Sequence, residues 1–167
     1  MSVIYIDTNI IISCYKPRDP MYKIANELFK RDFEFIISPI TLVELYSILS
    51  RIKPFLKLKK ELKQASIGTI VAFIIHDCHL KILAKGFLFR LSLFKTTFRI
   101  PLEYHLAMKF SEKLQLKTLD TLHLAYAYML RNEIDYFVTS DDDILAKKEK
   151  IKNYLGIEVK EPSELLK

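Results

Sequence analysis

Glycine and proline are scarce in this sequence, with three and six copies among 167 residues. This scarcity excludes long flexible linkers, low-complexity tracts and collagen-like patterns, and no internal repeat is present. The length fits one compact domain, and the 50% hydrophobic content is enough for a full core. The start of the chain lacks the positive region, long apolar stretch and cleavage site of a secretory signal, which predicts a cytoplasmic protein.

Several kinds of site and segment are also missing. The stretch from Gln64 to His76 carries no charged residue, but a membrane-spanning helix needs roughly 20 apolar residues, so a buried helix is predicted. The two cysteines, Cys14 and Cys78, are expected to be buried free thiols. His76 and His79 lie beside Cys78 without a fourth spaced ligand, which argues against a zinc site. There is no glycine-rich phosphate loop and no Ser or Cys with a credible His-Asp partnership.

Positive charge is concentrated in the middle of the chain. Residues 51–100 contain eleven Lys and Arg against Glu61 and Asp77, which is a net +9 within a chain of net +6, so the remainder carries −3. Such a segment beside an acidic remainder is typical of a phosphate-binding face next to a metal pocket. A solvated lysine-rich surface explains it equally well. The four phenylalanines between residues 87 and 98 favour packing in the core or a dimer interface over stacking on bases.

Apolar runs and helical patterns alternate along the chain. Strands are predicted at Val3–Ile6, Phe33–Ile37, His79–Leu83 and Ile134–Thr139, with an edge strand at Ile157–Val159. Helices are predicted from Asp19-Pro20, from Ser38-Pro39 to about Pro54, once or twice between 55 and 75, over Pro101–Leu116 and Leu119–Met129, and in the charged stretch after Asp143. This alternation predicts an α/β fold with a mostly parallel sheet, whose ligands bind beyond the carboxyl ends of the strands.

Four acidic positions stand out against this pattern: Asp7 and Asp141 directly follow strands, Glu44 lies near the start of a helix, and Asp120 begins an apolar helix. Singly, each has a structural explanation as a turn, a cap or a solvated helix residue. Together they need a cation, because neighbouring carboxylates raise one another's pKa. Oxygen-only ligands suit Mg²⁺ or Mn²⁺. His123 follows Asp120 by one turn, and its apolar helix favours packing over contact with the pocket or substrate.

The acidic residues lie within four segments whose order and spacing are informative: Ile4-Tyr5-Ile6-Asp7-Thr8-Asn9, Glu44 after Ser38-Pro39-Ile40-Thr41, Leu119-Asp120-Thr121-Leu122-His123-Leu124-Ala125, and Phe137-Val138-Thr139-Ser140-Asp141. These segments resemble the successive motifs of PIN domains. The resemblance covers nearly the whole chain. Residues from about 54 to 98 match no motif and are expected to form a basic helical segment.

The resemblance implies a single PIN-like domain over residues 1–167, with a three-layer fold around a mostly parallel sheet. It implies an endoribonuclease that uses Mg²⁺ or Mn²⁺ held by Asp7, Glu44, Asp120 and Asp141. The residues expected to orient these acids are Thr8, Asn9, Thr139 and Ser140. Many PIN domains are toxins of VapC-type toxin–antitoxin pairs and form homodimers, so RNA, an antitoxin and a second copy are the implied partners, with no membrane.

The run Asp141-Asp142-Asp143 leaves the fourth acid ambiguous. Asp141 is chosen because it lies closest to the strand end, and Asp143 is the alternate fourth acid, since an extended chain returns it to the same side. Asp142 is expected to cap the following helix.

Three other functions compete. A phosphoacceptor signalling domain would need an acceptor Asp after a mid-chain strand and a late Lys, and neither is evident. A catalytically silent PIN-like module that binds RNA or protein would typically have lost an acid, whereas all four are present. A DNA-directed nuclease stays open, because the acids do not distinguish ribose from deoxyribose.

Overall fold

A five-stranded parallel sheet forms the centre of the structure, a computed structural model that describes residues 1–167. Its strand order is β3-β2-β1-β6-β7, and every neighbouring pair is parallel. The strands are β1 (Ser2–Ile6), β2 (Phe33–Ile37), β3 (Leu80–Ile82), β6 (Tyr136–Val138) and β7 (Val159–Lys160). The strand order reverses between β1 and β6. Open α/β sheets bind ligands at such a point, beyond the carboxyl ends of the strands.

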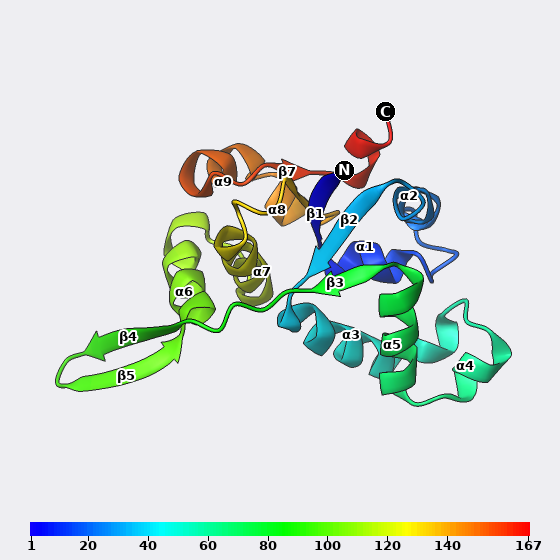
Figure 1. Cartoon of the computed structure of the whole chain (residues 1–167), viewed down its shortest axis with the longest axis horizontal. Helices are drawn as coiled ribbons and strands as arrows, with labels where there is room; N and C mark the ends of the chain where they lie inside the picture. The colour runs from blue at the N-terminus through cyan, green and yellow to red at the C-terminus, as the bar shows by residue number, and fades with distance from the viewer.

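Helices cover both faces of the sheet (Figure 1). On one face lie α1 (Thr8–Ser13), α2 (Tyr22–Leu28), α3 (Pro39–Ile52) and α5 (Ile67–Asp77), and on the other lie α6 (Leu102–Leu114), α7 (Thr118–Met129), α8 (Asp142–Leu145) and α9 (Lys148–Leu155). The short helices are η1 (Lys53–Phe55), α4 (Lys60–Gln64) and η2 (Pro162–Leu165). The predicted α/β fold with a central parallel sheet flanked by helices is confirmed.

The two cores follow from the alternation of side chains along β1. Ile4 and Ile6 point to one face and join the core under α1, α3 and α5, whereas Tyr5 points to the other face and joins the core under α6 and α7. The Tyr5 and Phe137 rings stack with centroids 5.3 Å apart. These four side chains are all buried, so β1 and β6 are anchored on both faces of the sheet and hold their carboxyl ends rigidly.

Helix α1 was not anticipated from the sequence. Its apolar residues Ile10, Ile11 and Ile12 are consecutive and all buried, so the run shows no helical period. The helix nevertheless begins directly after Asp7, which places that residue at the junction of β1 and α1.

The prediction of a helical segment over residues 54–98 is wrong for its second half. Beyond β3 the chain forms an antiparallel hairpin of β4 (Leu88–Leu93) and β5 (Thr96–Pro101). Its two-residue turn is Phe94-Lys95, without the Asn-Gly or Asp-Gly pair that signals a hairpin in a sequence. None of the four phenylalanines packs in either core: Phe89 is half-buried and its ring stacks on His105 with centroids 3.6 Å apart, and Phe87, Phe94 and Phe98 are exposed.

Cys14 and Cys78 are buried free thiols, as predicted. The uncharged stretch ending at His76 forms most of α5, which buries Ile70, Val71 and Ile74. None of the helices combines the length and apolar character that crossing a membrane requires.

Candidate functional site

Asp7 lies at the carboxyl end of β1 and is buried, with 5% of its surface exposed. Its Oδ2 accepts a hydrogen bond from Thr139 Oγ1 at 2.6 Å, and the same hydroxyl oxygen accepts one from the Asp141 amide at 3.0 Å. Thr139 therefore links the strand ends of β1 and β6. Burial raises the pKa of Asp7, although His123 and the Thr139 hydrogen bond act in the opposite direction.

Glu44 reaches the same place from the first half of α3. Its Oε2 accepts hydrogen bonds from the Thr8 hydroxyl and from His123 Nε2, the latter at 2.6 Å. Both bonds fall on one carboxylate oxygen, which leaves Oε1 without a protein donor. Burial works against ionisation, but the hydrogen bonds from His123 and Thr8 hold the pKa of Glu44 below its ordinary value.

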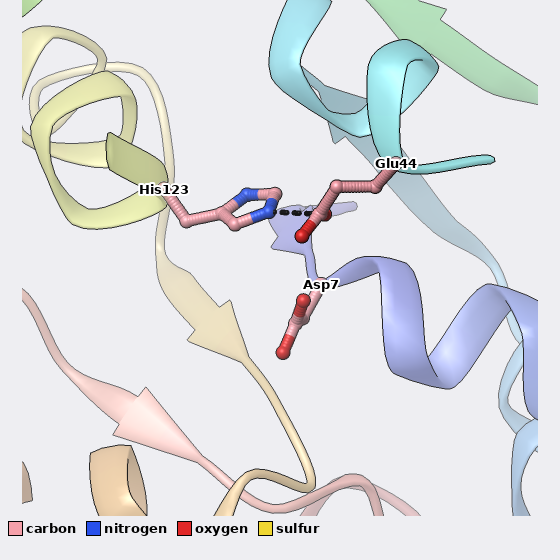
Figure 2. Close-up of side chains that lie close together, drawn as sticks. All are labelled: Asp7, Glu44 and His123. Atoms are coloured by element: carbon pink, nitrogen blue, oxygen red, sulfur yellow. Dashed lines mark hydrogen bonds and ion pairs between the residues drawn. The ribbon is translucent and has the colours of Figure 1, made fainter. Parts of the chain in front are cut away.

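His123 is the residue that the sequence analysis missed. It is buried in α7, as expected for a packed histidine, yet it also contacts the acids: one ligand atom each from Asp7, Glu44 and His123 all lie within 4.8 Å of one another (Figure 2). Burial lowers the pKa of His123, but the Glu44 hydrogen bond and the charge of Asp7 outweigh it, so that the pKa is raised overall. The available signal was the three-residue spacing from Asp120, which alone did not separate contact from packing.

A buried polar chain supports His123 from behind. The Tyr5 hydroxyl lies 3.0 Å from His123 Nδ1 and donates to Ser38 Oγ at 2.7 Å. Burial raises the pKa of Tyr5, so the group stays a neutral phenol. Because both ring nitrogens of His123 are engaged, its orientation toward Glu44 is determined by β1 and by the residue before α3.

Asp120 lies in the first turn of α7, where Lys117 and not Asp120 is the N-cap. Its Oδ2 is buried and has no hydrogen-bond partner. Burial, together with the charges of Asp141 and Asp7, raises the pKa of Asp120 to about 6. A buried carboxylate oxygen without a donor is rare in folded proteins and needs an explanation such as a bound ion.

The three consecutive aspartates have distinct positions. Asp141 is the N-cap of α8, and its Oδ1 accepts from the amides of Asp143 at 2.9 Å and Ile144 at 3.2 Å. The expectation that Asp142 would cap this helix is therefore wrong: Asp142 is exposed in the first turn, one residue too late for the extended cap conformation. Asp143 is exposed and pairs with Lys117 at 2.7 Å, which lowers the pKa of Asp143.

Of the four acids, only Asp141 lines a shallow surface depression, which has a volume of about 320 Å³. It is lined by Asn9, Lys117, Ser140, Asp141, Asp142 and Asp143. Asn9 and Ser140, predicted to orient the acids, thus lie at its wall, whereas Thr8 and Thr139 make the direct hydrogen bonds. A larger cleft of about 660 Å³ lies between the α1–α2 loop and η1, where its one acid, Asp19, is within 4.0 Å of Lys16. The larger cleft is therefore not the acidic site.

The donor set fits a hard divalent cation. No carboxylate of this set accepts hydrogen bonds through both of its oxygens. The unpartnered oxygens of Glu44 and Asp120 are therefore free to bind a metal. Burial is the main cause of the raised pKa values of Asp7 and Asp120, and neighbouring carboxylates raise them further, so a bound cation would favour their ionised forms.

Comparison with known proteins agrees with this arrangement. This chain superposes on a chain of a solved structure of VapBC2 from Rickettsia felis, which is bound to a DNA fragment from the VapBC2 promoter. The TM-score is 0.54 at 16% identity, and the match covers 95% of this chain and 98% of that one. At this identity the match shows the fold alone. No curated protein sequence matches significantly. The profile of the PIN domain matches residues 4–150, which include Asp7, Glu44, Asp120 and Asp141, and the chain therefore belongs to the PIN domain family.

Proposed function

We propose that this chain is a metal-dependent endoribonuclease that hydrolyses RNA phosphodiester bonds at the acidic site, with Asp7, Glu44, Asp120 and Asp141 as its catalytic acids. The observation that carries the proposal is the buried, unpartnered Asp120 Oδ2 beside the charges of Asp7 and Asp141. Membership of the PIN family, whose members are typically nucleases, supports it.

Mg²⁺ or Mn²⁺ would be held by carboxylate oxygens of these four residues. When bound there, the metal would activate a water for attack on phosphorus and neutralise charge on the phosphate. The candidate alternate acid, Asp143, is less suited, because it is exposed and engaged by Lys117.

The surrounding residues hold the acids in place. Thr139 orients Asp7 and fixes the Asp141 backbone, so that both strand ends keep one geometry. Thr8 and His123 both bond to Oε2 of Glu44, which leaves Oε1 without a protein donor. Such outer contacts hold ligand orbitals in position and commonly change metal affinity about 10- to 100-fold when they are removed.

We also propose that the chain acts in the cytoplasm as the toxin of a toxin–antitoxin pair, as a homodimer with an antitoxin partner. The fold match to a chain of a VapBC2 complex supports a protein partner. Co-expression with the product of a neighbouring short reading frame tests this: a complex that suppresses cleavage is expected, and cleavage unaffected by that product would contradict it.

The central test is cleavage by the purified chain of single-stranded RNA, structured RNA and single-stranded DNA in Mg²⁺, Mn²⁺ or EDTA. Asp7→Asn and Asp120→Asn keep the side-chain volume but remove a charged ligand, so each is expected to lower RNA cleavage by more than about 100-fold, beyond the loss typical of outer contacts. Asp32→Asn is the matched control, since Asp32 is exposed and forms no ion pair.

Calorimetric titration with Mn²⁺ gives a second readout, in which both variants should bind less tightly than the control. Cleavage by either variant at the wild-type rate would refute the assignment of the acids. Cleavage of DNA in place of RNA would redirect the proposal to a DNA nuclease, and RNA binding without cleavage in any metal would favour the silent module.

A further inference from the structure

The β4–β5 hairpin extends away from the body of the molecule as an arm (Figure 1). Six-residue strands make such an arm about 20 Å long. Its contacts with the body are at its base, where Phe89 stacks on His105 of α6 and the Leu102 amide donates to the Phe87 carbonyl. An isolated two-stranded hairpin is at best marginally stable in water, so a structure that leaves one uncovered suggests a binding partner.

The charge on this arm is of one sign. No Asp or Glu occurs from Cys78 to Leu102, and Arg90, Lys95 and Arg99 are exposed without an ion-pair partner. The strand register places Arg90 directly opposite Arg99, which is an unfavourable like-charge pair on one face of the ribbon. Nothing within the chain offsets this repulsion, whereas a polyanion lying along that face would.

The tip carries an exposed aromatic ring. Phe94 is fully exposed in the turn and has a φ of 53°, in the left-handed region that a bulky side chain rarely adopts. Lys95 follows it immediately. An exposed ring next to a cation is the arrangement with which proteins stack a base and hold the neighbouring phosphate of a single strand.

The arm is separated from the acidic site by the length of α6. Glu103 near the start of α6 accepts from Tyr126 late in α7, and Ser111 near its end contacts Thr121, so the two helices run antiparallel. Asp120 therefore lies at the opposite end of α6 from the hairpin, about 20 Å away along the helix. A single nucleic-acid strand bound at the acidic site can therefore extend along α6 to the arm.

We propose that the β4–β5 hairpin is an RNA-binding arm, in which Arg90 and Arg99 bind phosphates of a single strand and Phe94 stacks on one of its bases. This inference rests on the proposed function for the identity of the nucleic acid. The other face of the ribbon, with Leu91, Leu93 and Phe98, is apolar and would suit a second copy of the chain. A second copy on that face would leave Arg90 and Arg99 on the opposite face without a partner, and their unpaired charge therefore favours RNA as the occupant of the arm.

The experiment measures fluorescence anisotropy of a labelled single-stranded RNA of about 20 nucleotides, enough to span arm and site at about 3.4 Å per nucleotide. It is done in EDTA across a salt series, so that no cleavage occurs. Arg90→Ser with Arg99→Ser should weaken binding at least about fivefold and lower the slope of log affinity against log salt by about 1.4, at roughly 0.7 per phosphate contact. Arg90→Lys with Arg99→Lys should keep the wild-type slope.

The matched control is Lys23→Ser with Lys30→Ser, which removes two exposed, unpaired charges from the α2 region and should leave the affinity within twofold. Phe94→Ala should weaken single-strand binding about tenfold without changing the salt slope, and should leave binding of a duplex RNA unchanged, because stacking needs an unpaired base. Circular dichroism and thermal melting confirm that each variant is folded.

The inference is overturned if the wild-type chain does not bind RNA, or if the Arg90/Arg99 serine variant matches wild type. It is also overturned if sedimentation shows that the hairpin variants lose a dimer while RNA affinity stays the same, which would assign the arm to self-association. Loss of RNA binding in these variants, with no cleavage by any chain in Mg²⁺ or Mn²⁺, would refute the proposed function and leave this inference standing.

Discussion

Replacing Asp120 by Asn is expected to stabilise the metal-free protein while weakening metal binding. The fold raises the pKa of Asp120 from its ordinary value near 3.8 to about 6, chiefly through burial. The folded state thus binds a proton more tightly than the unfolded state, and stability falls as the pH rises from about 4 to about 6. Above that range the wild-type protein carries a carboxylate that the fold does not neutralise, and asparagine removes it.

The size of the gain follows from the shift. Two pKa units correspond to about 3 kcal/mol. Asp120 is partly exposed and lies in the first turn of α7, where the helix dipole favours negative charge, so screening and the dipole reduce the gain to about 1 kcal/mol. For a chain of this length that gain raises Tm by about 2–4 °C.

Thermal melting in EDTA at pH 7.5 and at pH 4 measures the effect. Asp120→Asn should melt at the higher temperature at pH 7.5 and show no advantage at pH 4, while Asp32→Asn should match wild type at both. Addition of Mn²⁺ should stabilise the wild-type protein by mass action and the variant far less. A lower Tm for Asp120→Asn in EDTA at pH 7.5 would refute the reasoning, because the side chain would then be stabilised by contacts absent from this structure.

Three further predictions concern the same site. Metal-dependent cleavage should fall as the pH drops through about 6, because a protonated Asp120 is a poor ligand, and a flat rate from pH 5 to 8 would contradict this. Thr139→Val should lower stability by about 1.5–3 kcal/mol in urea denaturation, since it removes a buried hydrogen bond to a carboxylate, and an unchanged midpoint would show that the bond contributes nothing. Asp141→Asn should fold normally, because asparagine also caps helices, yet lose Mn²⁺ affinity in calorimetry. Asp143→Asn should lose only its exposed ion pair with Lys117 and keep its Mn²⁺ affinity. Loss of Mn²⁺ affinity in Asp143→Asn, with that of Asp141→Asn unchanged, would make Asp143 the fourth acid.

Hydrophobic patterning predicted most helices and strands, because the pattern of each depends only on residues that are near one another in the sequence. The run ending at Ile6 and the run ending at Val138 are buried on both faces of the sheet, and such strands are recognisable from their continuous apolar residues. The hairpin was missed because its turn has no glycine or asparagine, and its exposed apolar residues imitate a core segment.

The sequence by itself determined the positions of Asp7 and Asp141 at strand ends and of Glu44 and Asp120 near helix starts, since strand ends and helix starts follow from local residue preferences. Only the tertiary structure decided that His123 holds Glu44, because these residues are 79 positions apart and meet only when α3 and α7 pack around β1. The tertiary structure also gave Asp141 and Asp143 different roles. Asp143 pairs with Lys117, which is 26 positions away, whereas the extended backbone after β6 makes Asp141 the helix cap. Contacts of this kind depend on how distant elements pack, and no local pattern in the sequence encodes them.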